Sequence, residues 1–136
     1  MKSELLEIIQ QKVSEKILKL EQLIVETRAS DKYETSREML QQEINNLQIQ
    51  LNEHLKSQKI LKNINVNPHK VVSLGSWVET NKGKFFIAIS LGEILFNQEK
   101  VFVISTESPL AKAMNGKKVG DVFLINNSPQ TITNIL

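Results

Sequence analysis

Two carboxylates three residues apart, Asp31 and Glu34, form the pair whose type and spacing could do chemistry. On a helix start, residues three apart lie within about one turn of each other, so both acids could reach one cation. Carboxylate oxygens suit Mg²⁺, and two of them leave its other positions open. One interpretation is therefore a Mg²⁺ site that only a partner macromolecule completes. The other interpretation, which the local sequence alone favours, is structural, because Asp31 at the N-cap and Glu34 at N3 would form a capping box.

The elements that must position this pair are two helices. Apolar residues recur in steps of three or four on both sides of it, which is typical of helices that pack along their length. The first seam contains Leu6, Ile9, Val13, Ile17, Leu20 and Ile24, and the second contains Leu40, Ile44, Leu47, Leu51 and Leu55. In an antiparallel hairpin the numbers of facing residues have a constant sum, and here that sum is 64. The chain is therefore predicted to reverse near Lys32. A continuous helix that dimerises is the alternative, because no Gly or Pro interrupts the segment.

The two halves of the chain differ in composition. All five glycines and all three prolines lie after Asn67, whereas residues 1–65 carry ten basic and ten acidic residues. Pro68 ends helices and its neighbouring asparagines tolerate irregular backbone. We predict a coiled-coil hairpin at 1–64, a linker at 65–70 and a separate domain at 71–136.

The second half is typical of short strands bounded by turns. Strands are predicted at 71–80, 84–91, 100–105, 121–125 and 131–136, the first two joined through Asn81-Lys82-Gly83. Ser108-Pro109 predicts the start of a short helix, because Ser caps helices and Pro suits the first helical position. The fold class is therefore α+β: a helical hairpin, then a small antiparallel sheet with one short helix.

Composition also excludes several classes of function. The chain has no cysteine, so it has no disulfide or thiolate metal site, and its two histidines do not suggest a metal cluster. Neither half carries the dense basic surface of a sequence-specific DNA-binding protein. No apolar run is long enough for a membrane span, and the N-terminus is unlike a signal peptide. We expect a cytoplasmic protein with no membrane partner.

One run of the second half resembles a known family. Residues 108–122, SPLAKAMNGKKVGDV, are similar to the signature of the C-terminal domain of Gre transcript-cleavage factors. Gly75-Ser76-Trp77-Val78 resembles that family's opening strand, and residues 101–105 stand where the family has the strand that precedes this signature. The resemblance covers most of residues 71–136 and implies an FKBP-like fold.

The Gre resemblance implies bacterial RNA polymerase as the partner. In that family a coiled coil enters the secondary channel of the polymerase with an Asp-x-x-Glu pair at its tip, which Asp31 and Glu34 match. Glu107, Ser108 and Pro109 match the turn through which Gre factors contact the channel rim. The resemblance further implies that the chain is not an enzyme alone, that no cofactor is tightly bound, and that Mg²⁺ is shared with the polymerase active site. It makes the 3′ end of nascent RNA a further candidate partner.

The tip departs from the family pattern. Gre tips commonly read Asp-Leu-x-Glu-Asn, whereas Lys32 and Thr35 stand at the second and fifth positions here. A positive charge beside the two acids weakens their hold on Mg²⁺. Three functions therefore stay open: a factor that stimulates cleavage of backtracked RNA, a non-cleaving channel binder that inhibits or modulates the polymerase, and a folding enzyme or coiled-coil adaptor.

Overall fold

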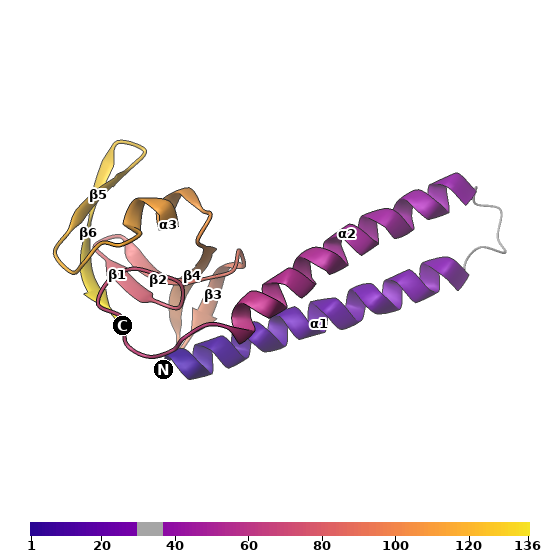
Figure 1. Ribbon diagram of the computed structural model, residues 1–136, viewed down its shortest axis with the longest axis horizontal. Helices are drawn as coiled ribbons and strands as arrows, with labels where there is room; N and C mark the ends of the chain where they lie inside the picture. The colour runs from indigo at the N-terminus through magenta and orange to yellow at the C-terminus, as the bar shows by residue number, and fades with distance from the viewer. Residues whose placement is uncertain (30–36) are drawn as a thin grey trace. The chain divides into compact units, whose positions relative to one another are not determined.

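The computed structural model describes residues 1–29 and 37–136 and has the predicted α+β class. Helices α1 (Lys2–Ala29) and α2 (Arg37–Lys62) form the antiparallel hairpin, and a sheet with one short helix follows (Figure 1). The chain divides into two compact units. The hairpin unit is Leu6–Lys62, and the C-terminal unit combines Asn63–Leu136 with Met1–Leu5. The first residues of α1 therefore belong with the C-terminal half.

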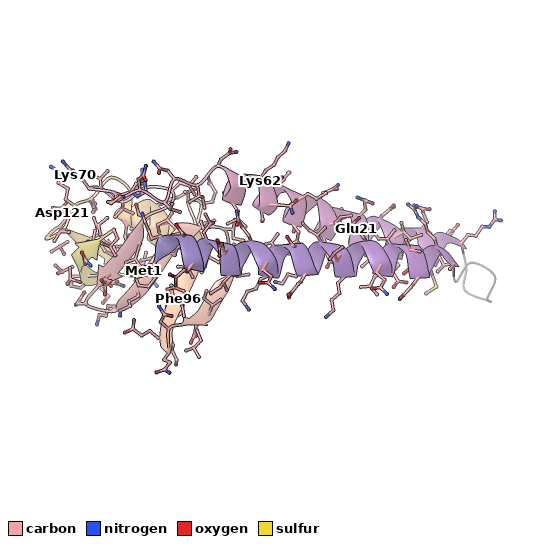
Figure 2. All side chains as sticks on the ribbon, turned by 90° about the horizontal axis from the view of Figure 1, so that it is seen from below. Met1, Glu21, Lys62, Lys70, Phe96 and Asp121 are labelled. Carbon is pink, nitrogen blue, oxygen red and sulfur yellow. The ribbon has the colours of Figure 1, made fainter. Side chains whose placement is uncertain are left out.

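The buried seam of α1 follows the predicted spacing. Leu6 is half-buried, and the remaining predicted members are buried: Ile9, Val13, Ile17, Leu20 and Ile24. Charged residues of this helix such as Glu21, which is labelled in Figure 2, are exposed. None of the helices that the structure describes has the length and apolar character needed to cross a membrane.

The predicted seam of α2 is correct as far as Leu51 and wrong at Leu55, whose side chain is 41% exposed. The buried stripe continues instead through His54, Gln58 and Leu61. The reason is geometric: a helix has 3.6 residues per turn, so two successive steps of four rotate a side chain off the face. Two polar residues therefore occupy positions that an apolar pattern could not reveal.

The C-terminal unit is built on a six-stranded sheet with the order β3-β4-β2-β1-β6-β5. The strands are β1 (Trp77–Thr80), β2 (Gly83–Ala88), β3 (Gly92–Phe96), β4 (Glu99–Ser105), β5 (Val122–Ile125) and β6 (Ser128–Ile135). All neighbours pair antiparallel except β2 and β4, which run parallel with Phe86 beside Val103. Helix α3 (Pro109–Met114) lies between β4 and β5 in the chain, as predicted.

Three strand predictions need correction. The first strand begins only at Trp77, because residues 71–76 form a loop whose hydrogen bonds go to separate segments, such as Val72 N–H to the Lys117 carbonyl and Gly75 N–H to the Ile87 carbonyl. Strand β3 was not predicted, since this edge strand is mostly exposed and shows no apolar alternation. Strand β6 begins three residues earlier than predicted, because Asn126 and Asn127 adopt positive φ and make a two-residue turn.

Both faces of the sheet bury apolar side chains. Helix α3 contributes Ala111 and Met114 to a cluster that covers one face. That cluster also holds Val72, Val78, Phe85, Ile87, Phe123, Ile132 and Ile135. Trp77 and Phe86, which pair across β1 and β2, are buried on the other face. The sheet is therefore the rigid support for the turn that leads into α3.

Candidate functional site

Asp31 and Glu34 lie outside the residues that the structure describes, as does the predicted reversal near Lys32. The structure describes the helices on either side of them. Helix α1 ends at Ala29 and α2 begins at Arg37, with 28 and 26 residues. At 1.5 Å per residue each helix is about 40 Å long. In the sequence, the two acids lie between the last residue of α1 and the first residue of α2.

The other end of α1 is anchored by a buried lysine. The Lys2 side chain is only 6% exposed, and its Nζ donates hydrogen bonds to the carbonyls of Asn67 at 2.8 Å and Gly75 at 3.1 Å. A third contact joins Nζ to Nδ1 of His69 at 3.1 Å. These three acceptors use the three donors of an ammonium group. A buried charge is stabilised here without a carboxylate.

This anchor sets the protonation state of His69. An ammonium group can only donate hydrogen bonds. Nδ1 of His69 therefore accepts the bond from Lys2 and carries no proton, so the imidazole ring is uncharged. Burial and then the Lys2 charge lower the pKa of His69 below its ordinary value of 6.5, while a hydrogen bond to the backbone of Leu136 raises it in part. Burial likewise lowers the pKa of Lys2.

Gly75 makes the anchor possible. Its φ is +91°, which favours glycine, and a Cβ at this position would lie 2.6 Å from the carbonyl oxygen of Asn65. The backbone of the linker therefore passes against Gly75 at a distance that only a glycine allows.

The turn Glu107-Ser108-Pro109, which is predicted to contact the channel rim, is held in place by the start of α3. The hydroxyl of Ser108 caps that helix by accepting a hydrogen bond from Ala111 N–H at 3.1 Å, and Pro109 occupies the first turn. Glu107 precedes the cap with its side chain 83% exposed and forms an ion pair with Lys112 at 3.6 Å. The turn thus presents one acidic side chain from a fixed backbone, while its role in partner binding stays a prediction.

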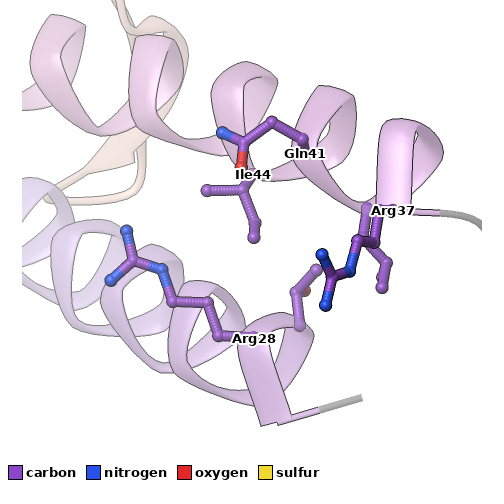
Figure 3. Close-up of a pocket in the computed structure, with 6 residues that line it drawn as sticks. Arg28, Arg37, Gln41 and Ile44 are labelled. Carbon is purple, nitrogen blue, oxygen red and sulfur yellow. The ribbon is translucent and has the colours of Figure 1, made fainter. Parts of the chain in front are cut away.

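A cleft in the hairpin unit was missed by the sequence analysis. Its volume is about 410 Å³, and its described lining residues are Thr27, Arg28, Arg37, Leu40, Gln41 and Ile44. Arg28 extends from α1 and Arg37 from α2 toward the space between the two helices (Figure 3). The sequence could have indicated this cleft, because the two arginines lie almost symmetrically about the predicted midpoint of the hairpin.

The described residues contain no group of three or more His, Cys, Asp or Glu side chains that could hold a metal ion. His54, the histidine on α2, is half-buried in the hairpin seam. The Mg²⁺ site predicted at Asp31 and Glu34 lies outside the described residues and stays a prediction, and two carboxylates would supply only part of the coordination shell.

A comparison with protein families identifies the C-terminal half of the chain. The family model for the C-terminal domain of the transcription elongation factors GreA and GreB matches residues 67–134. The matched segment is half of the chain, so the protein belongs to the GreA/GreB family.

Among solved structures, the chain is similar to the GreA factor homolog 1 (Gfh1) protein of Thermus thermophilus. The two share 19% sequence identity over 98% of this chain and 93% of that chain, with a TM-score of 0.38. A comparison with curated proteins finds no match.

Proposed function

We propose that this chain binds bacterial RNA polymerase at the rim of its secondary channel and stimulates cleavage of backtracked RNA through Asp31 and Glu34. The observation that carries the proposal is the GreA/GreB match over residues 67–134 in a chain whose first half is a helical hairpin. The chain acts as an accessory factor in the cytoplasm, and the reaction belongs to the polymerase.

The docking step is assigned to the C-terminal unit. The turn Glu107-Ser108-Pro109 is held by the α3 cap, and the exposed Glu107 carboxylate offers a negative charge to a basic partner surface. Because the hydroxyl of Ser108 is committed to the cap, its contribution is to fix the turn rather than to contact the polymerase.

The chemical step is assigned to the hairpin. A helix pair of about 40 Å can deliver two carboxylates into a deep channel. Asp31 and Glu34 would contribute hard oxygen ligands and orient a water molecule at the polymerase active site. When Mg²⁺ is bound there, it supplies the Lewis acid that activates that water. That water would attack the phosphorus of a phosphodiester bond upstream of the 3′ end of the nascent RNA, so that the ribose 3′ oxygen leaves and the released 3′-terminal fragment carries the phosphate at its 5′ end.

A non-cleaving regulatory role is the second candidate, and one feature of the sequence favours it. Lys32 stands between the two acids in the sequence, and a positive charge beside two acids weakens their hold on a cation. A chain of this kind would occupy the channel and inhibit or modulate the polymerase.

A cleavage assay on stalled elongation complexes with purified polymerase tests the proposal. The parent chain is expected to stimulate cleavage, and Asp31→Ala and Glu34→Ala are expected to abolish stimulation while polymerase binding is retained. Glu21→Ala, which removes an exposed acid from α1, is the matched control and leaves both readouts unchanged.

Docking is tested separately in a pulldown. Glu107→Ala is expected to weaken polymerase binding without changing the fold of the domain. Inhibition by the parent chain would support the regulatory role instead. An equal loss of binding and cleavage in the Asp31 and Glu34 variants would make those residues structural.

A further inference from the structure

The sheet of the C-terminal unit has two edge strands, β3 and β5, which stand first and last in the strand order (Figure 1). The outer side of an edge strand carries backbone N–H and C=O groups to which a further strand can add. Natural proteins commonly protect such edges with charged side chains. The two edges of this sheet differ in that protection.

Charged side chains protect strand β3. The strand contains Glu93, which forms an ion pair with Lys100 of the neighbouring β4 at 3.7 Å. Leu95 is the most exposed apolar residue of β3, at 70%, and it lies directly opposite Lys100 in the register. A strand from another molecule that paired with β3 would have to remove these charges from water, which is costly. This edge is therefore poorly suited to a partner strand.

Strand β5 has no such protection. Residues 122–136, which form β5, the following turn and β6, contain no charged residue. The side chains of Val122 and Leu124 are 56% and 64% exposed, whereas Phe123 between them is buried in the core. Pro129, which lies opposite Leu124 on β6, is also exposed and extends the apolar surface. The outer strand at this end of the sheet is therefore both uncharged and apolar.

The register of the β5–β6 hairpin shows which backbone groups of β5 point outward. A two-residue turn joins the strands, so the flanking residues Ile125 and Ser128 form a hydrogen-bonded pair. Hydrogen-bonded and non-hydrogen-bonded pairs alternate along an antiparallel ladder. The next pair, Leu124 and Pro129, is therefore a non-hydrogen-bonded pair, in agreement with the missing N–H of proline. The N–H and C=O groups of Leu124, and by the same alternation those of Val122, point away from β6.

The spacing and charge of this edge suit a second copy of the same strand in the antiparallel direction. When Phe123 of one copy lies opposite Phe123 of the other, Val122 of each copy pairs with Leu124 of its partner. The two pairs exchange four hydrogen bonds and bring apolar side chains together on one face. Lys117 and Lys118 precede β5, so antiparallel pairing places the lysines of the two copies at opposite ends. Parallel pairing would bring these like charges together.

We propose that two copies of this chain associate through β5, in a symmetric interface that joins their six-stranded sheets edge to edge. An uncharged strand meets an identical uncharged strand, so neither copy has to bury a charge. Strand β5 has only four residues, which is short for a permanent interface, so the dimer is reversible and forms as the concentration rises. The proposal goes beyond the transcription role, because the association needs no polymerase.

Analytical ultracentrifugation of the full chain tests the proposal. The parent chain is expected to shift with concentration from its monomer mass of 15.5 kDa toward twice that mass. Val122→Lys and Leu124→Lys should each weaken association at least about 10-fold, because a symmetric interface contains every substitution twice. Leu95→Lys, on the other edge strand, is the matched control and should leave association unchanged. The fluorescence of Trp77 confirms that each variant is folded.

Cross-linking tests the register, because the chain has no cysteine of its own. A mixture of Val122→Cys and Leu124→Cys chains should form an interchain disulfide, since opposite residues lie about 5.5 Å apart. Either variant alone places its cysteines diagonally, beyond the reach of about 7 Å. Equal cross-linking of the single variants, or dissociation of the dimer by Leu95→Lys, overturns the proposal. A parent chain that stays monomeric also overturns it, and the edge would then be open to an extended segment of another protein.

Discussion

The two ends of α1 use their cations in opposite ways. Lys2 is buried, and its ammonium has three acceptors from the linker and from Gly75. Arg28 is exposed and lines a cleft with the second arginine, Arg37, with no carboxylate partner among the described residues. A buried charge whose donors are all used contributes to stability, whereas an exposed charge contributes little. The difference separates a residue that holds this molecule together from one whose removal should change its stability little.

The largest expected effect is at Gly75, whose carbonyl accepts from Lys2. Gly75→Ala should lower the free energy of unfolding by about 3 kcal/mol, because it combines an unfavourable backbone conformation with an overpacked contact. Gly92 is a matched control, since its φ is also +91° but nothing lies within 4 Å of an added Cβ. Gly92→Ala should cost about 1 kcal/mol.

Urea unfolding followed by the fluorescence of Trp77, the only tryptophan, measures both variants in the C-terminal unit. The difference between them isolates the close approach of the linker to Gly75. Equal losses for the two alanine variants would show that the linker moves aside at little cost, and the anchor would then be less rigid than its geometry indicates.

The next effect is at Lys2 itself. Lys2→Met keeps the aliphatic stem but removes the donors, which leaves the buried carbonyl of Gly75 without its Lys2 hydrogen bond. We expect a loss of about 2 kcal/mol, the usual cost of an unsatisfied buried acceptor. Lys19→Met on the exposed face of α1 should change stability by less than about 0.5 kcal/mol in the same urea experiment. A similar loss in both variants would mean that the buried ammonium has no special role.

Sequence reasoning predicted the features that depend on local spacing. The hairpin, the turn into α3 and the existence of five of the six strands follow from periodicity and from capping residues, although the predicted starts of β1 and β6 were wrong. The seam failed at Leu55 because His54 and Gln58 continue the buried stripe, and an apolar pattern does not detect polar residues at seam positions. Strand β3 was missed because pairing with β4, rather than its own composition, makes it a strand.

Long-range contacts could not be predicted. The Lys2 anchor joins residues that are 65 to 73 positions apart, and nothing local to Lys2 distinguishes it from the other lysines of α1. The arginine cleft is different, because the rarity of arginine and its symmetric placement were readable in the sequence. Asp31 and Glu34 remain a prediction from the sequence and the family, since they lie outside the described residues.

A smaller effect is expected from pH through His69. Its folded-state pKa is lowered below 6.5, mainly by burial and then by Lys2, so the unfolded chain binds a proton more readily than the folded chain. The stability that this neutral ring contributes is therefore fully present above pH 6.5 and is lost as the pH falls below that value. The pH dependence of urea unfolding should show this decline in the parent chain. His69→Gln should remove it, and a decline that persists in the variant would assign it to other groups.

The smallest expected effect on stability is at the arginine cleft, which lies at the end of α1 opposite Lys2. Arg28→Met and Arg37→Met remove exposed cations that have no carboxylate partner in the described ranges, so the free energy of unfolding should change by less than about 0.5 kcal/mol. Arg37→Met should be the more favourable of the two, because it removes a positive charge from the N-terminal end of a helix. Thermal unfolding followed by the helical circular-dichroism signal measures both. A loss comparable with that of Lys2→Met would show that the arginines hold the helices together, and the cleft would then be part of the hairpin's own packing.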